Sequence, residues 1–240
     1  MNKQLVDVFL DTQEKIKMLD SDTITTKHTY DNIIYPDFDK NIENVKVVNA
    51  DTVSALMTYS RKGKTAVLNM ASFKKPGGGV RNGARAQEEC LFRCSNLSTI
   101  STDFYPLKPN EALYTKDSIF IKNFYYNDME PVICDTVTIP AINLNSFARY
   151  DDLQSDLDYE NITKDKIRLM LSLCISNHVE NVILGAWGCG VFKNEPQTIA
   201  QYFKDVIKEG YNNFDNIVFA IINDHNSVDN NYKIFKETLV

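Results

Sequence analysis

Three consecutive glycines constrain the fold of this 240-residue chain more than any other feature of its sequence. Gly77, Gly78 and Gly79 follow residues 65–69, a short apolar run with the length and composition of a buried strand. After them, apolar side chains recur at steps of three and four residues between positions 86 and 100, which is typical of one helix face. The sequence therefore predicts a strand, a glycine loop and a helix in immediate succession.

The glycine loop and the start of the predicted helix have the chemistry of a polar pocket. Glycine adopts dihedral angles closed to other residues and lets a ligand approach bare backbone. Gln87, Glu88 and Glu89 fall in the first turn of the helix, where free N–H groups and the dipole favour anions. Acidic residues there are otherwise ordinary complements of the dipole, an alternative that the adjacent glycines weaken. Neighbours on a helix point in different directions, so we expect different roles for the two glutamates.

A second glycine loop follows the predicted strand at residues 181–186 and precedes a predicted helix at 196–208. A strand, a Gly-x-Gly turn and a helix together can bind anions through backbone N–H groups. Gly188 and Gly190 supply that turn. A dinucleotide oxidoreductase loop is excluded, because Lys193 stands where its third glycine belongs.

These two stretches resemble a known family. Pro-Gly-Gly-Gly, seven residues and then Gln-Glu-Glu (residues 76–89) is similar to the signature of poly(ADP-ribose) glycohydrolases. Residues 68–71 and 82–84 resemble the microbial-type branch, and residues 184–196 resemble its diphosphate-binding loop. The two matches occur in the expected order along the chain.

The resemblance implies a macrodomain-like three-layer α/β/α fold with a central mixed sheet. The alternation of strands and helices in the second half independently predicts a mostly parallel or mixed sheet covered on both faces. We expect residues 1–240 to form a single domain, with residues 1–40 as an accessory N-terminal segment. Within that segment, residues 3–19 have the pattern of an amphipathic helix.

The resemblance also implies where the ligand lies. ADP-ribose would cross the carboxyl ends of the strands, a usual ligand position in open α/β sheets. Its diphosphate would rest on residues 185–192 and its distal ribose against the glycine triplet. The implied substrate-binding residues are Asn69, Gly77, Gly78, Gly79, Gln87, Gly185, Gly188, Cys189, Gly190, Val191 and Phe192.

Three of the implied contacts have structural alternatives. Asn69 would bond the ribose hydroxyls or cap the end of its strand, and Phe192 would stack near the ribose or belong to the core. Asp51 would accept a hydrogen bond from the adenine amine or cap the helix that follows it. Trp187 is expected to be a packing residue, and Cys189 a small residue whose backbone matters.

The implied reaction is hydrolysis of the ribose–ribose O-glycosidic bond. A carboxylic acid must protonate the leaving oxygen and a carboxylate must activate water. Adjacent glutamates cannot flank the bond from two sides, so one residue would serve first as acid and then as base. The resemblance implies Glu89 for this role and Glu88 for orienting the ribose or the leaving hydroxyl, with no metal and no cofactor.

Two other functions remain open on the sequence. The chain could bind ADP-ribose without cleaving it, although the intact acidic pair argues against a purely binding role. It could also remove single ADP-ribose units from proteins or nucleic acids. The expected partner is ADP-ribose or poly(ADP-ribose) on modified proteins.

Composition limits the remaining function classes. A net charge of −6 and a pI near 5.1 argue against a broad face for duplex nucleic acid, so we expect no sequence-specific nucleic-acid binding. The three histidines are far apart, which gives a zinc site little support. Five cysteines without a Cys-x-x-Cys motif indicate reduced thiols. No apolar run approaches ~20 residues. We therefore expect a monomeric cytoplasmic or nuclear protein without a membrane span.

Several local predictions complete the set. Residues 21–40 read as irregular surface chain, and residues 112–122 as a short hairpin with its turn at Lys116-Asp117. We expect Tyr125 and Tyr126 at the cleft. Phe147, Arg149 and Tyr150 are candidate substrate contacts in a polar loop.

Overall fold

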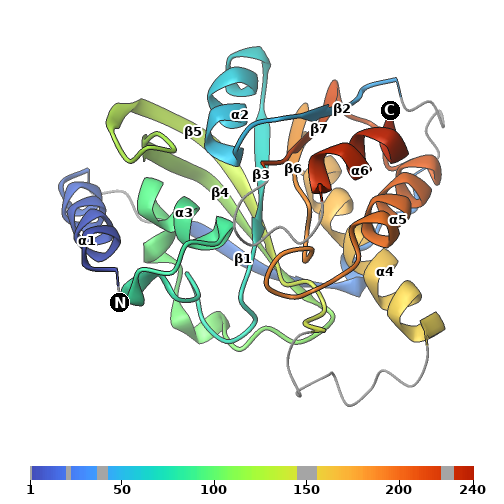
Figure 1. The fold of residues 1–240 in the computed structure, drawn as a ribbon, viewed down its shortest axis with the longest axis horizontal. Coiled ribbons are helices and arrows are strands. Elements are labelled where there is room, and N and C mark those ends of the chain that lie inside the picture. The colour runs from blue at the N-terminus through green and yellow to red at the C-terminus, as the bar shows by residue number, and fades with distance from the viewer. Residues whose placement is uncertain (1, 20–22, 37–42, 145–155, 223–229) are drawn as a thin grey trace.

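One mixed sheet of seven strands organises the computed structural model, in the order β1-β4-β5-β3-β6-β7-β2 (Figure 1). The structure describes residues 2–19, 23–36, 43–144, 156–222 and 230–240. The strands are β1 (Ile24–Thr29), β2 (Val45–Val48), β3 (Thr65–Met70), β4 (Glu111–Lys122), β5 (Asp128–Ile139), β6 (Asn181–Leu184) and β7 (Asn216–Ala220). Strands β5, β3, β6, β7 and β2 run parallel, whereas β4 and β1 are antiparallel to their neighbours. The carboxyl ends of five strands therefore meet at one edge.

Helices cover both faces of this sheet (Figure 1). One face carries α4 (Asp156–Ser176), α5 (Pro196–Lys208) and α6 (Asn231–Leu239), and the other carries α1 (Lys3–Met18), α2 (Thr52–Tyr59) and α3 (Gln87–Cys94). The predicted α/β fold with a central mixed sheet is confirmed. Within the described ranges, no helix has the length and apolar character needed to cross a bilayer.

Strand β3 explains why the central strands have continuous apolar sequences. Ala66 and Leu68 pack into the core beneath α4, α5 and α6, whereas Val67 packs into the core beneath α2 and α3. Because successive side chains of a strand point to opposite faces and both faces are covered, each position must be apolar. The exceptions in β3 are Thr65 at its start and Asn69 near its end, and Asn69 is a fully buried polar side chain.

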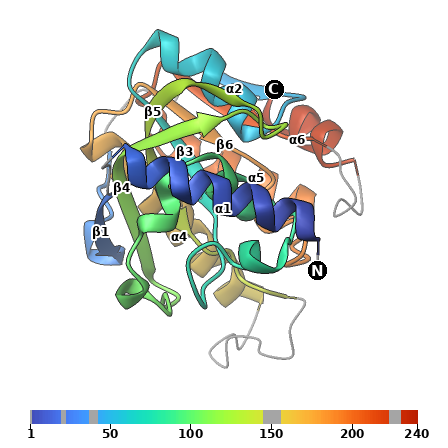
Figure 2. The same ribbon diagram turned by 90° about the vertical axis from the view of Figure 1, so that its left-hand side faces the viewer.

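The N-terminal helix predicted at residues 3–19 is present as α1. Asn2 caps it by accepting a hydrogen bond from the Leu5 amide at 3.3 Å. Phe9, Thr12 and Ile16 are its buried residues. The helix crosses the molecule as an outer layer beside α3, as Figure 2 shows.

The predicted hairpin at residues 112–122 is wrong. These residues belong to the single long strand β4, and Lys116-Asp117 forms a bulge where the register against β5 shifts. Asp117 has a φ of 52°, and its amide donates a hydrogen bond to Asp135 at 3.0 Å. Because a bulge uses the same residue types and backbone angles as a tight turn, its sequence resembles that of a turn. The true turn of the hairpin spans residues 123–127, between β4 and β5.

The irregular chain predicted at residues 21–40 is also partly wrong, because residues 24–29 form β1. This edge strand pairs with β4 and is rich in threonine, which fits a half-exposed pleated strand. Phe147, Arg149 and Tyr150 lie outside the described residues.

Candidate active site

A cavity of about 690 Å³ opens at the carboxyl edge of the parallel strands. Met70, Ala141 and Ala220 line it from the ends of β3, β5 and β7 or just beyond them. Ligands of open α/β sheets usually bind at this edge. Further lining residues come from the second glycine loop, the start of α3, helix α1 and the turn between β4 and β5: Gly188, Gly190, Val191, Phe192, Ala86, Gln87, Cys90, Gln4, Leu5, Val8, Phe124, Tyr125 and Tyr126.

The first glycine loop lies directly against the two glutamates. Gly78 has a φ of +50°, and a Cβ on this residue would lie 2.7 Å from Glu89 Oε1 and 2.9 Å from Glu88 Oε2. A side chain would therefore be strained and would displace both carboxylates. The loop can close over the acidic pair only because this position is glycine.

Glu88 is held by the backbone on both oxygens. Its Oε2 accepts a hydrogen bond from the Ser72 amide at 2.7 Å, and its Oε1 accepts one from the Gly77 amide at 3.2 Å. The Asn69 side chain lies 3.5 Å from Oε1. Burial, the largest cause, and the nearby charge of Glu89 together raise the pKa of Glu88 to about 8, despite the lowering effect of its hydrogen bonds. Glu88 is therefore a fixed carboxyl that favours its neutral form.

Replacing Glu88 by glutamine should remove a pH dependence of stability. Because folding raises the pKa of Glu88 from 4.5 to about 8, the unfolded chain releases a proton that the folded protein keeps. The free energy of unfolding therefore falls as pH rises between those values, by at most roughly 5 kcal/mol. Between about pH 5 and about pH 8.5, urea unfolding should show the wild type losing at least about 2 kcal/mol more than Glu88→Gln. Equal losses in the two proteins would contradict the raised pKa.

Glu89 differs from its neighbour in having one uncommitted oxygen. Its side chain is buried, and Oε1 accepts a hydrogen bond from the Gly79 amide at 2.8 Å. Its Oε2 has no partner among the described residues, and neither does the buried Oδ1 of Asn69. Leaving buried oxygens unpaired is costly. Two such acceptors beside one glycine loop suit the hydroxyl groups of a ligand.

Gln87 lines the cavity, but its polar atoms bind the protein. Its Oε1 accepts a hydrogen bond from the Met70 amide at 2.9 Å, while Nε2 donates to the Leu68 carbonyl at 2.6 Å and to Thr52 Oγ1 at 3.2 Å. These bonds join the end of β3 to the starts of α2 and α3. The Gln87 side chain therefore holds the end of β3 and the starts of α2 and α3 in place, and it offers a ligand no free polar atom.

The second glycine loop presents free backbone donors. Gly188 has a φ of +78°, and with Gly190, Val191 and Phe192 it lines the cavity. The amides of these four residues donate to no other described residue. Unpaired N–H groups in a glycine turn form an anion-binding concavity, so the loop can bind a phosphate group.

Two buried side chains of this loop, Trp187 and Asn194, fix it to the segment that leaves β5, and Lys166 fixes α4 to the same segment. Trp187 Nε1 donates to the Ile139 carbonyl at 3.1 Å, and Lys166 Nζ donates to the Pro140 carbonyl at 3.0 Å. Asn194 Nδ2 donates to the Ile142 carbonyl at 2.8 Å and to the Gly188 carbonyl at 3.0 Å. Burial lowers the pKa of Lys166 to about 7. Sequence reasoning missed Asn194 and Lys166 because their partners are main-chain carbonyls more than 20 residues away.

The remaining implied contacts divide into two groups. Gly185 and Cys189 do not line the cavity. A Cβ on Gly185 would lie 2.2 Å from Met70 Cε, so this glycine permits close packing, and Cys189 is a small buried residue. Phe192 packs against the core and also lines the cavity, and its stacking near the ribose stays a prediction.

Asp51 has the predicted capping role. Its Oδ1 accepts a hydrogen bond from the Ser54 amide at 2.9 Å at the start of α2. It also lines the cavity, as do Tyr125 and Tyr126, which were expected at the cleft. The glutamates, Asn69 and the glycine triplet do not line the cavity themselves. Asn69 and Glu88 directly adjoin the lining residues Met70 and Gln87 in the chain, and the triplet contacts the two glutamates. Within the described ranges, no group of three or more His, Cys, Asp or Glu side chains could hold a metal ion.

Comparison with known proteins agrees with this geometry. Residues 9–125, which include the first glycine loop and the acidic pair, match the family model described as microbial-type PARG, catalytic domain. No curated protein matches the chain.

Two solved structures share the fold. The poly(ADP-ribose) glycohydrolase of Thermomonospora curvata bound to the inhibitor ADP-HPD has a TM-score of 0.83 and 20% sequence identity, over 98% of this chain and 99% of that one. The poly(ADP-ribose) glycohydrolase of Deinococcus radiodurans in complex with ADP-ribose has a TM-score of 0.77 and 24% identity, over 90% of this chain and 94% of that one. Residues 9–125 are thus similar to the catalytic domain of microbial-type poly(ADP-ribose) glycohydrolases, and the chain shares the fold of the two bacterial enzymes.

Proposed function

We propose that this protein is a poly(ADP-ribose) glycohydrolase that cleaves ribose–ribose O-glycosidic bonds and releases ADP-ribose. The observation that carries the proposal is the buried Oε2 of Glu89, which has no partner among the described residues and belongs to a carboxyl whose Oε1 is bound to the first glycine loop. Residues 1–240 would act as one domain and as a monomer, in the cytoplasm or nucleus.

The substrate would be bound at two places that the sheet edge brings together. The diphosphate would accept hydrogen bonds from the amides of Gly188, Gly190 and Val191, which line the cavity. The distal ribose would lie at the glycine triplet, where the unpaired Oδ1 of Asn69 can accept a bond from a hydroxyl. This assignment uses the free donors for the anion and the free acceptors for the sugar.

Glu89 would transfer the proton in both steps of hydrolysis. In its acid form, Oε2 donates a proton to the bridging oxygen as the bond from that oxygen to the anomeric carbon breaks. The resulting carboxylate then takes a proton from the water whose oxygen bonds to the anomeric carbon. The Gly79 amide, 2.8 Å from Oε1, fixes the carboxyl during both steps. Glu88, fixed by Ser72 and Gly77, would orient the ribose.

The proposal is tested by incubating the purified protein with automodified poly(ADP-ribose) and, separately, with mono-ADP-ribosylated protein. Release of free ADP-ribose from the polymer, measured by chromatography, is the expected result. Release from the mono-ADP-ribosylated protein alone would favour the single-unit hydrolase instead. Tight ADP-ribose binding without release from either substrate would indicate a binding module.

A further inference from the structure

Helix α1 contributes one face to the wall of the ligand cavity. Gln4, Leu5 and Val8 line the cavity, although α1 lies outside the sheet and its three-layer core. Gln4 and Val8 are one turn apart, and Asp11 and Lys15 continue the same stripe at steps of three and four residues. The first half of the stripe therefore faces the cavity, and the second half faces another part of the protein.

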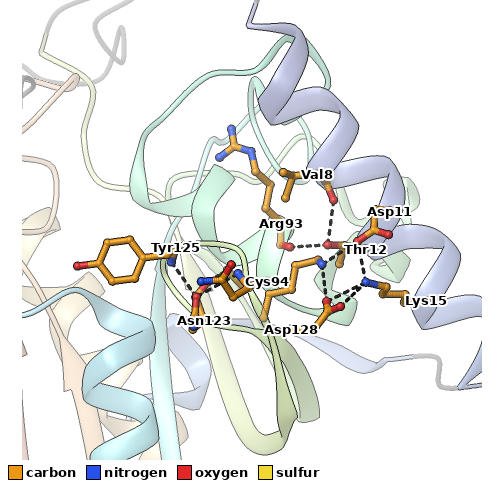
Figure 3. A network of polar contacts seen from close by, with 11 residues as sticks. Val8, Asp11, Thr12, Lys15, Arg93, Cys94, Asn123, Tyr125 and Asp128 are labelled. Atoms are coloured by element: carbon orange, nitrogen blue, oxygen red, sulfur yellow. Dashed lines mark hydrogen bonds and ion pairs between the residues drawn. The ribbon is translucent and has the colours of Figure 1, made fainter.

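An ionic cluster holds the second half of this stripe on the β4–β5 hairpin (Figure 3). Lys122 Nζ lies 2.7 Å from Asp11 and 2.6 Å from Asp128, and Lys15 Nζ lies 2.6 Å from Asp128 and 3.0 Å from Asp11. The Lys122 side chain is only 4% exposed, so this charge depends on its two carboxylates. The two lysines and the two aspartates alternate in this cluster. They fix α1 to Lys122 at the end of β4 and to Asp128 at the start of β5.

A second connection joins α1 to the first glycine loop and to the turn between β4 and β5. Arg93 is fully buried, and its Nε donates to the Leu5 carbonyl at 3.3 Å while Nη1 donates to Tyr126 Oη at 3.2 Å. Its guanidinium also donates to the Ala84 carbonyl of the glycine loop. Thr12 Oγ1 donates to the Arg93 carbonyl at 2.6 Å (Figure 3). The cavity face of α1 is therefore held in a fixed position relative to the loop and the turn.

We infer that α1 is a substrate-binding element whose Gln4, Leu5 and Val8 face closes the nucleoside end of the ADP-ribose site. This inference rests on the proposed function, because the diphosphate is placed at the second glycine loop and the distal ribose at the first. Tyr125 and Tyr126 of the β4–β5 turn line the same cavity as this face of α1 and the second glycine loop.

The chemistry of this wall fits a nucleoside. Leu5 and Val8 are apolar, and the two tyrosines of the turn are aromatic, which suits the flat faces of a purine ring. The Gln4 amide offers a donor and an acceptor at the rim, where it can bond the edge of the base or a ribose hydroxyl. The accessory helix thus supplies a binding surface that the core fold lacks.

The test fills the cavity from α1 and compares each variant with a control on the same helix. Val8→Trp and Gln4→Trp place a large ring in the cavity, whereas Leu10→Trp and Lys3→Trp place it on the solvent side, where Leu10 is already 47% exposed. Circular dichroism melting confirms that each variant is folded. Because Gln4 is exposed, its variant remains informative if Val8→Trp does not fold.

Calorimetric titration is done with two probes, ADP-ribose and ADP, which lacks the distal ribose. The expected result is at least a tenfold weaker Kd for both probes in the two cavity variants, and a change of less than twofold in the controls. Wild-type affinity in both cavity variants would overturn the inference while leaving the proposed function intact. Weakened ADP-ribose binding with unchanged ADP binding would place α1 at the ribose end and overturn its assignment to the nucleoside. If the wild-type protein neither releases ADP-ribose from the polymer nor binds ADP-ribose in the titration, the proposed function is contradicted, and this inference with it.

Discussion

Glu89→Gln should reduce turnover of poly(ADP-ribose) by a factor of at least about 10², because one general acid typically contributes roughly 10²- to 10⁴-fold. The variant should still bind ADP-ribose. Glutamine has nearly the same shape and keeps a carbonyl oxygen for the Gly79 amide, which lies 2.8 Å from Oε1 of the glutamate. It cannot donate the proton that the leaving oxygen needs and cannot take one from water. Turnover is measured as ADP-ribose released from the polymer, and binding by calorimetric titration.

Glu88→Gln is the matched control, because it makes the same chemical change one residue away. Glutamine can keep one of the two backbone hydrogen bonds that Glu88 accepts, and Glu88 transfers no proton in the proposed reaction, so its variant should keep a larger share of turnover than Glu89→Gln. Comparable turnover in Glu89→Gln and the wild type would reject the acid/base assignment. A larger loss in Glu88→Gln would transfer the acid/base role to that residue.

Gly188→Val, unlike Glu89→Gln, should weaken ligand binding. A Cβ at this position would lie 2.6 Å from Asn194 Nδ2 and 2.7 Å from Ala141 Cβ, and the φ of +78° is strained for valine. Left-handed backbone costs a branched residue roughly 1–3 kcal/mol, and overpacking costs a similar amount. If the loop moves to relieve this strain, its amides lose their alignment, and the affinity for ADP-ribose should fall about 100-fold.

Cys189→Ala is the control for this prediction. Cys189 is buried beside Gly188 and lies outside the cavity lining, so its thiol should matter little. We expect a Kd for ADP-ribose within about threefold of the wild type, a difference below roughly 1 kcal/mol. Equal binding by Gly188→Val and the wild type would show that the second glycine loop does not hold the diphosphate.

Local sequence signals were sufficient for the elements that frame the site. Helix α5 begins at Pro196 and ends at Lys208, as its periodicity predicts, because a proline at the first turn and an apolar stripe act within a few residues. The two glycine loops could be recognised for a similar reason, since Gly78 and Gly188 have backbone angles that other residues avoid.

Contacts between distant segments could not be predicted in this way. Lys116-Asp117 has the sequence of a turn, and only pairing with β5 makes it a bulge. Sequence analysis identified the amphipathic helix at residues 3–19 but not its cavity face, because that face depends on Arg93 and Lys122. The difference between Glu88 and Glu89 likewise depends on which amides the folded glycine loop directs at each carboxylate.

The two side chains of the second glycine loop that bind the carbonyls of Ile139 and Ile142 have a thermodynamic consequence. They attach this loop, where we place the diphosphate, to the end of β5 and the segment just beyond it before any ligand arrives. A flexible turn would have to give up conformational entropy on binding, at a cost of roughly 1–2 kcal/mol for each residue that becomes ordered. Here that entropy is already lost when the protein folds, so more of the hydrogen-bond energy of the turn remains available to the ligand.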